Sequence, residues 1–208
     1  MFTAGTLTFQ EFMSREPVPL AVIQKAILEF LRGRDDAVIF GAQAVNAYVR
    51  EPRMTQDIDL MSFRAAELAE DLRQYLSGTF HIAVRVPKLS KRHGYRLYQT
   101  SKGGSRHLVD LRPVEKLPPT RRIAKVLVVD PPELIALKVI AYHGRRGTPK
   151  SGTDWRDLAM LLLAFPELKL NPETVTERLK AASANKSVLN VWNELVKQKI
   201  KPSKSDDN

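Results

Sequence analysis

The sequence predicts an α+β fold, in which a small mixed β-sheet is flanked by helices and followed by a C-terminal helical region. Three observations support this prediction. Short apolar runs typical of buried strands alternate with helical periodicities up to about residue 128. After Pro131 and Pro132, every periodic segment is helical. With 208 residues, 43% of them hydrophobic, the chain can build one compact domain with a small appendage.

The first part of the chain alternates between the two patterns. Helices are predicted where apolar residues recur at helical spacing, at residues 17–32, 42–49 and 64–76. Strands are predicted at short apolar or alternating runs, at residues 37–40, 57–62, 80–84, 95–98, 107–111 and 123–129. Gly33 and Gly78 would end two of the helices, and Gly103-Gly104 would form the turn of a hairpin.

The second part of the chain is predicted to be helical, at residues 133–143, 154–165, 172–182 and 186–199. A polar, glycine-containing stretch at residues 144–152 would form a flexible loop. We therefore divide the chain into an α/β domain at residues 1–128, a helical region at residues 129–200 and a disordered polar tail at residues 201–208.

The net charge of +10 is concentrated in one segment. Between His81 and Lys125 there are twelve lysine and arginine residues but only two acidic ones, Asp110 and Glu115. A concentrated positive surface attracts polyanions, so nucleic acid or a nucleoside triphosphate is an expected partner. The alternative is a solvated basic hairpin without such a ligand.

Composition excludes several classes of protein and site. Because the chain has no cysteine, disulfides and thiolate metal sites are impossible. No apolar run approaches the roughly 18 residues of a membrane span, and the first residues lack the pattern of a signal peptide. We therefore expect a cytoplasmic protein with no membrane partner.

Asp57 and Asp59 carry the strongest functional signal. Residues two apart in a strand point to the same face, so these carboxylates would converge while Ile58 faces the core. Gly41, sixteen residues before Asp57, follows an apolar strand and permits a tight turn. Two carboxylates beyond a glycine turn suit a site for Mg²⁺ and a nucleoside triphosphate, and hence phosphoryl or nucleotidyl transfer. The alternative is a plain strand-end turn with solvated acids.

Four segments, in this order, resemble nucleotidyltransferase-fold proteins of the DNA polymerase β superfamily, and more nearly its AbiEii-like and minimal nucleotidyltransferase branch. They are residues 41–48 with Gly41-Ala42, residues 52–60 with Asp57-Ile58-Asp59, residues 138–145 with Lys138 and Arg145, and residues 150–158 with Lys150, Asp154 and Asp157. The resemblance implies a nucleotidyltransferase fold for residues 1–128. It also implies an enzyme that uses Mg²⁺, or Mn²⁺ in its place, to transfer a nucleoside monophosphate from an NTP to an acceptor hydroxyl.

The resemblance further implies roles for individual residues. Asp57, Asp59 and Asp110 would be the catalytic metal ligands, and Asp110 would also activate the attacking hydroxyl. A phosphate would approach the backbone at the turn formed by Gly41 and Ala42. The other residues expected to contact nucleotide or acceptor are Arg53, Thr55, Lys138, Arg145 and Asp154.

The acceptor and the biological partner are expectations of the same kind. RNA, including tRNA, is the first candidate acceptor because the basic segment surrounds Asp110; a protein side chain or a small molecule follows. Many members of the branch belong to bacterial toxin–antitoxin systems, which implies a toxin with a cognate antitoxin.

Gly41-Ala42 departs from the usual Gly-Gly or Gly-Ser, so a serine hydroxyl contact to phosphate is lost. Two other hypotheses therefore remain. One is a catalytically silent module of this fold that binds nucleic acid or a partner protein. The other is a metal-dependent nuclease.

Simpler structural interpretations exist for several polar residues. Asp110 could pair with Arg106 or Arg112, and Lys138 could extend its ammonium group to water. Asp154 could serve the helix dipole, and we interpret Asp157 as a partner in a helix-surface ion pair.

The remaining histidine and aromatic residues are given structural or surface roles. The four histidines lack metal-ligand spacing and are interpreted as surface or nucleic-acid-facing residues: His81, His93, His107 and His143. Trp155 and Trp192 are predicted core anchors. Tyr95 and Tyr98 are expected to pack within strands, with base stacking as the alternative.

Overall fold

A mixed β-sheet forms the centre of the computed structural model, which describes residues 18–89, 94–101 and 104–202. The sheet order is β3-β5-β6-β2-β1-β8-β7, with β4 paired to β5. The strands are β1 (Ala37–Phe40), β2 (Ile58–Ser62), β3 (Ala83–Arg85), β4 (Lys88–Leu89), β5 (Gly94–Ser101), β6 (Gly104–Pro113), β7 (Thr120–Ile123) and β8 (Val126–Val129). β1 runs parallel to β8 and β2 parallel to β6, while the other pairs are antiparallel. The predicted mixed sheet is confirmed.

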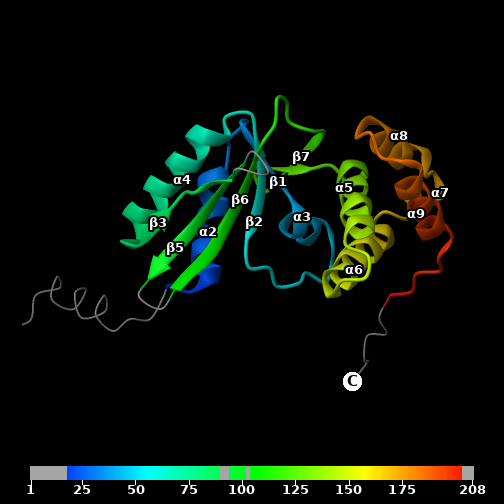
Figure 1. Ribbon diagram of the computed structural model, residues 1–208, viewed down its shortest axis with the longest axis horizontal. Helices are drawn as coiled ribbons and strands as arrows, with labels where there is room; N and C mark the ends of the chain where they lie inside the picture. Colours follow the sequence, from blue (N-terminus) through cyan, green and yellow to red (C-terminus); the bar gives the residue numbers. More distant parts are fainter. Residues whose placement is uncertain (1–17, 90–93, 102–103, 203–208) are drawn as a thin grey trace, which may run out of the picture.

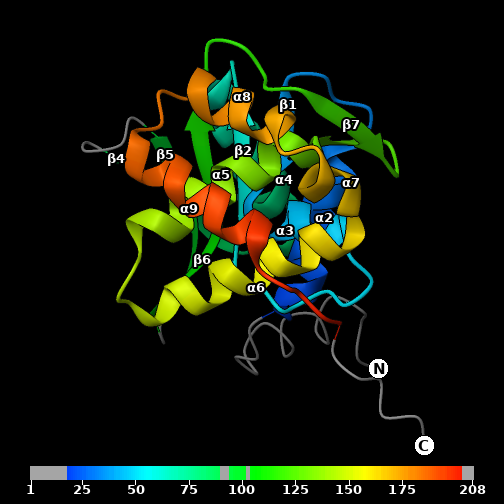
Figure 2. The same ribbon diagram turned by 90° about the vertical axis from the view of Figure 1, so that its right-hand side faces the viewer.

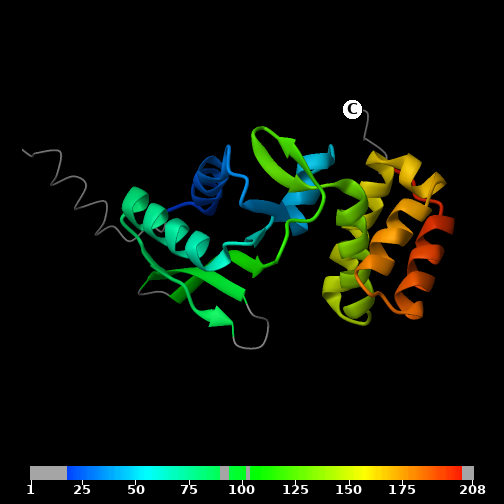
Figure 3. The same cartoon turned by 90° about the horizontal axis from the view of Figure 1, so that it is seen from above.

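Two helices lie on one side of this sheet (Figures 1 and 3). They are α2 (Leu20–Leu31) and α4 (Ala65–Phe80). Each buries a stripe of aliphatic side chains at helical spacing, such as Ile23, Ile27 and Leu31 of α2. α4 packs against β3, β5 and β6, so it covers this face of these strands.

The helical region gathers at the other end of the molecule (Figure 3), where Figure 2 shows its helices in front of the sheet. It contains α5 (Pro131–Gly144), α6 (Pro149–Ala164), α7 (Pro166–Leu170), α8 (Glu173–Ala181) and α9 (Lys186–Lys197). Asp130 caps α5 by accepting a hydrogen bond from the backbone N–H of Glu133. α3 (Gly41–Tyr48) contacts both α5 and α6 and so joins this region to the sheet. Trp192 is fully buried within the region, as predicted.

Several boundaries differ from the predictions. α4 continues through Gly78 and ends where His81 takes a left-handed conformation with φ of 51°, so the predicted strand at 80–84 begins only at Ala83. The predicted strand at 123–129 is a hairpin of β7 and β8, because Ala124 and Lys125 both take positive φ at its turn. Such turns usually contain glycine or asparagine, so the sequence offered no signal for this one.

The region after residue 144 is also more ordered than predicted. α6 begins at Pro149, where proline is tolerated in the first turn, so the predicted loop at 144–152 shortens to residues 145–148. Neither β4 nor α7 is predicted from the sequence. Trp155 is 41% exposed, which makes its prediction as a core anchor wrong.

Some predictions fall on residues outside those that the structure describes. Lys91, Arg92, His93, the first half of the predicted Gly103-Gly104 turn, and most of the predicted tail at 201–208 lie outside the described residues. The change from strands to helices falls between β8 and α5, while the division into separate domains stays a prediction. Among the described helices, none combines the length and the hydropathy needed to cross a bilayer.

Candidate active site

Two neighbouring strands, β2 and β6, place the predicted acidic residues side by side, and β1 lies next to them. In the register of β1 with β2, Phe40 lies opposite Asp59, and in the register of β2 with β6, Asp59 lies opposite Asp110. Asp57 comes just before β2 and lies two residues from Asp59, on the same side of the strand. The sheet therefore brings Asp57, Asp59 and Asp110 together, from positions more than fifty residues apart along the chain.

Gly41 closes this site from the β1 side. Its φ of 69° is in the left-handed region, which glycine enters without steric cost. A Cβ at this position would lie 1.9 Å from Oδ2 of Asp59 and 2.6 Å from its Cγ. The glycine is therefore required twice, by the backbone conformation and by the close approach of the Asp59 carboxylate.

Because Gly41 is required for both reasons, we expect Gly41→Ala to lower activity more than Gly33→Ala does. Gly33 also has a positive φ, 76°, but its Cβ would meet no atom within 4 Å. Both variants should lose about 1–2 kcal/mol of stability from the left-handed backbone. Only Gly41→Ala must also displace Asp59, and a misplacement of this size should lower activity by about 100-fold. Urea unfolding and transfer assays on the two variants measure both effects; equal activity would contradict the close approach.

His107 is the residue of the site that the sequence analysis missed. Its Nδ1 lies 3.1 Å from Oδ2 of Asp57, and its Nε2 lies 3.5 Å from Oδ1 of Asp110. One ligand atom from each of these three residues lies within 4.8 Å of the other two. His107, interpreted from the sequence as a surface or nucleic-acid-facing residue, is therefore a candidate ligand.

A β-bulge explains the position of His107. Leu97 pairs with Val109 but Tyr98 pairs with His107, so Leu108 is an extra residue in β6. Leu108 and Val109 are both fully buried, and the bulge brings His107 to the same face as Asp110 although the two are three residues apart. In a regular strand an odd separation places side chains on opposite faces, so no sequence signal could have indicated this contact.

Charges within the site shift its pKa values in opposite directions. Hydrogen bonds to Asp110 and Asp57 raise the pKa of His107 to about 10, and the bond from His107 holds the pKa of Asp57 below its usual value. Burial opposes ionisation of Asp110, but bonds from His107 and from Nε of Arg96, at 2.6 Å, outweigh it and lower the pKa of this carboxyl. Asp110 thus pairs with Arg96 and His107, and not with the Arg106 or Arg112 considered from the sequence.

Asp59 differs from the other two carboxyl groups. Burial, followed by repulsion from Asp57 and Asp110, raises its pKa to about 6. Burial is the larger cause of this shift, and the smaller contribution from repulsion shows that the three carboxyl groups converge. A divalent cation would relieve that repulsion, and carboxylate oxygens are ligands that Mg²⁺ and Mn²⁺ accept. The donor set therefore fits the metal that the sequence analysis expects.

A buried ion-pair network lies behind the site. Asp157 on α6 is fully buried and accepts two hydrogen bonds from Arg53, at 2.7 and 2.9 Å. Nζ of Lys138, on α5, donates to the same carboxylate at 2.6 Å. Asp154 is also buried; it lies 3.8 Å from Lys138 and accepts from Arg145 at 2.8 Å. The interpretation of Asp157 as part of a helix-surface pair is wrong, because its whole side chain is enclosed.

Several residues expected to bind the nucleotide take part in this ion-pair network. Lys138 does not extend to water, and its ammonium group is bound to Asp157. Thr55 donates its hydroxyl to the carbonyl of Asp57, at 3.0 Å, and so orders the loop that carries the first acid. Ala42 is buried beside Gly41 in the first turn of α3. The roles of Ala42, Arg53, Thr55, Lys138, Arg145 and Asp154 toward a nucleotide remain predictions.

The basic segment does not form one compact patch. Among the described residues, Arg85 and Lys88 are exposed near the β3 edge of the sheet, whereas Arg121 and Arg122 are exposed on β7 at the opposite edge. The first group lies on β3 and β4, which pair with β5, the neighbour of the strand that carries Asp110. The concentration seen along the sequence is therefore divided in space.

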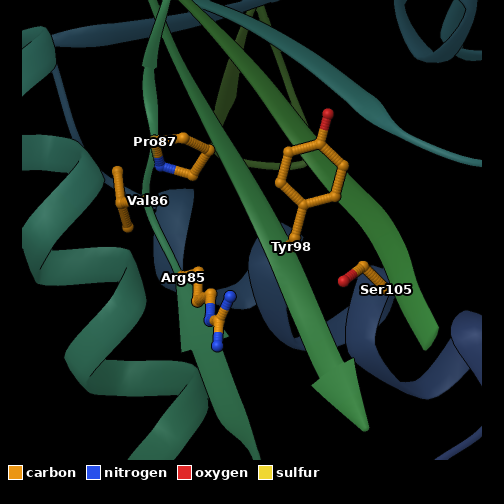
Figure 4. Close-up of a pocket in the computed structure, with 5 residues that line it drawn as sticks. All are labelled: Arg85, Val86, Pro87, Tyr98 and Ser105. Atoms are coloured by element: carbon orange, nitrogen blue, oxygen red, sulfur yellow. The ribbon is translucent and has the colours of Figure 1, made fainter. Parts of the chain in front are cut away.

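A hollow of about 490 Å³ lies beside the first group. Figure 4 shows its lining residues, with Tyr98 of β5 beside Ser105 of β6 and facing the segment Arg85, Val86 and Pro87. The ring of Tyr98 also packs against His107, with ring centres 5.0 Å apart. Tyr98 thus connects this hollow to the acidic cluster.

The arrangement of glycine turn, strand-end acids and helical region can be compared with known proteins. A family model described as "Nucleotidyl transferase AbiEii toxin, Type IV TA system" matches residues 26–205. The chain belongs to this family. Its membership confirms the resemblance and the prediction of a nucleotidyltransferase. Comparison with curated protein sequences gives no match.

Solved structures support the fold of this AbiEii family member. Polyadenylate synthase of Megavirus is similar, with a TM-score of 0.59 and 14% identity, over 71% of this chain and 32% of the viral one. JHP933 of Helicobacter pylori is similar with a TM-score of 0.51 and 13% identity, over 85% and 87% of the two chains. This chain spans only about a third of the length of the viral protein. Together the comparisons confirm the predicted α+β nucleotidyltransferase fold.

Proposed function

We propose that this AbiEii family member transfers a nucleoside monophosphate from an NTP to an acceptor hydroxyl, with Mg²⁺ as the metal and RNA as the acceptor. The observation that supports this proposal most is that Asp59 on β2 lies opposite Asp110 on β6, with Gly41 close to the Asp59 carboxylate. Family membership supports the reaction class. It also supports a toxin with an antitoxin partner, acting in the cytoplasm where NTPs and RNA occur.

Each residue has a defined task in this proposal. Asp57, Asp59 and Asp110 would hold the metal, which would supply charge stabilisation for the attacking and leaving oxygens. The left-handed turn at Gly41 lets the triphosphate approach the backbone N–H groups at the start of α3, where the helix dipole favours anions. Asp110 accepts the proton of the acceptor hydroxyl as its oxygen bonds to the α-phosphorus. The bond between the α- and β-phosphates breaks, and pyrophosphate leaves.

The acceptor side is assigned to the strands beyond Asp110. The hollow that Tyr98 lines is mainly apolar and has Arg85 at its rim, with Lys88 exposed on the neighbouring strand β4. An aromatic ring and nearby cations suit a nucleobase and its phosphates. Because Tyr98 also contacts His107, a nucleotide in this hollow would lie close to the acids that activate its hydroxyl.

Replacing Tyr98 with alanine tests this assignment. Loss of one base-stacking contact, worth about 1–3 kcal/mol, should raise the KM for an RNA acceptor about 10-fold or more. The KM for the NTP should change little, because Tyr98 lies on the acceptor side. Tyr98→Phe keeps the ring and should behave like the wild type. An unchanged RNA KM in Tyr98→Ala would place the acceptor elsewhere.

The function as a whole is tested by label transfer. Purified protein and Mg²⁺ are incubated with each α-³²P-labelled NTP in turn, and total RNA and cell lysate serve as acceptors. We expect label in RNA that depends on Mg²⁺ and is lost on addition of EDTA. Label in protein alone would support the transferase reaction but identify protein, and not RNA, as the acceptor. Absence of label with every NTP would favour the silent binding module, and shortening of the RNA would identify a nuclease.

A further inference from the structure

We propose that His107 is a ligand of the metal at this site and that its nitrogen makes the site prefer Mn²⁺ to Mg²⁺. The inference rests on the proposed function, because it assumes the metal held by Asp57 and Asp110. It goes beyond that function by naming a nitrogen ligand and the ion selectivity that follows from it. The starting observation is that Asp57, His107 and Asp110 place one ligand atom each within 4.8 Å of one another.

The position of His107 is specified by three features of the strands. The bulge at Leu108 turns the ring to the face that carries Asp110. Tyr98 packs against one side of the ring, with an angle of 31° between the two planes. Nε2 lies 3.1 Å from the carbonyl oxygen of Val109. A hydrogen bond at Nε2 would leave Nδ1, the nitrogen nearer Asp57, to face the ion, and histidine ligands usually donate their other ring N–H in this way.

A nitrogen ligand changes which ion the site favours. Mg²⁺ prefers oxygen ligands and usually keeps several waters, whereas imidazole suits first-row transition metals. Mn²⁺ accepts carboxylates as Mg²⁺ does and is the weakest binder among the divalent first-row transition ions. It is nevertheless a softer ion than Mg²⁺, so it accepts a nitrogen ligand more readily than Mg²⁺ does. With the imidazole as an additional ligand, the site should therefore bind Mn²⁺ more tightly, relative to Mg²⁺, than the same carboxylates would without it.

A different role for His107 is compatible with the same distances. The ring lies between two carboxylates, so it could simply hold Asp57 and Asp110 in place and move aside when a metal binds. The two roles differ in one observable. A ligand is coupled magnetically to the bound ion, while a displaced side chain is not.

The test uses the whole chain and Mn²⁺ as the probe. Electron paramagnetic resonance counts free Mn²⁺, and competition with Mg²⁺ gives the affinity for both ions. Pulsed resonance then detects any ¹⁴N nucleus bonded to the ion. The variants are His107→Ala, Asp57→Asn and, as a matched control, His143→Ala. His143 contacts Ser187 in the helical region, away from the acidic cluster.

We expect ¹⁴N coupling in the wild type and in His143→Ala, and none in His107→Ala. Loss of the nitrogen should weaken Mn²⁺ binding at least about 10-fold, since outer-shell changes alone cost 10- to 100-fold, and should weaken Mg²⁺ binding much less. Bound Mn²⁺ without ¹⁴N coupling in the wild type, or equal losses for both ions in His107→Ala, would overturn the inference.

The design separates this inference from the proposed function. If Asp57→Asn weakens the binding of both ions and His107→Ala does not weaken Mn²⁺ binding selectively, the carboxylate site is supported. Only the proposed role of His107 then fails. If Asp57→Asn binds both ions as the wild type does, the metal site itself fails, and both proposals fall together.

Discussion

Asp57→Asn is expected to lower nucleotidyl transfer by at least about 1,000-fold, because an anionic ligand is lost from the charge-stabilising site. Folding should be unaffected. Asp57 precedes β2, and 30% of its side chain is exposed, so no core contact depends on it. The measurement is initial-rate incorporation of labelled nucleotide by wild type and variant, together with urea unfolding of both.

Asp71→Asn is the matched control for this substitution. Asp71 lies on α4 with 48% of its side chain exposed, and its charged neighbour Arg34 is 3.7 Å away. It should retain full activity and nearly full stability, because exposed pairs contribute about 0–1 kcal/mol. If Asp57→Asn instead kept wild-type transfer, the acidic cluster would not be the catalytic centre.

Asp157→Asn should destabilise the fold by about 3–5 kcal/mol, because it removes a fully buried charge that pairs with the buried Lys138 and the partly buried Arg53. Arg53 and Lys138 both bind the Asp157 carboxylate, and Asp154 is 3.8 Å from Lys138, too far to replace it fully. Urea unfolding at pH 7 measures the loss. Glu194→Gln, which breaks the exposed pair with Arg146, should cost no more than about 1 kcal/mol. Equal losses for the two variants would show that the buried network adds no stability.

The contribution of Asp157 to the free energy of unfolding should also fall at low pH. Burial alone would raise its pKa, but the bonds from Arg53 and Lys138 outweigh burial and hold the pKa below the ordinary 3.8. A carboxyl group with a lowered pKa stabilises the fold above its unfolded pKa and loses this contribution as pH falls through the folded value. The difference between wild type and Asp157→Asn should therefore be full at neutral pH and shrink below pH 3.8.

The acidic part of the site could be predicted from the sequence because it follows local rules. Asp57 and Asp59 are two residues apart, and the alternation of a strand fixes their common direction. Gly41 follows an apolar run, and its position beside Asp59 needed only the pairing of two adjacent strands. Asp110 required the family resemblance, since no local pattern indicates that β6 lies next to β2.

The rest of the site depends on contacts that no local pattern encodes. Arg53 and Asp157 are 104 residues apart, and the side of α6 that faces the core is decided by packing against α5. The basic segment looks continuous along the chain, but the strand order sends β3 and β7 to opposite edges. His107 was not predicted for a different reason: the one additional residue in β6 turns it to the face that carries Asp110.

That additional residue also affects how relatives should be aligned. With Leu108 present, the histidine lies three positions before Asp110, yet both side chains belong to the same candidate metal site. In a relative whose strand is regular, the equivalent side chain would come two positions before the third aspartate. An alignment without a gap here would match His107 to a core residue of that relative and hide a shared histidine. Homology searches for this residue should therefore compare its place in space, and allow its sequence offset to differ by one.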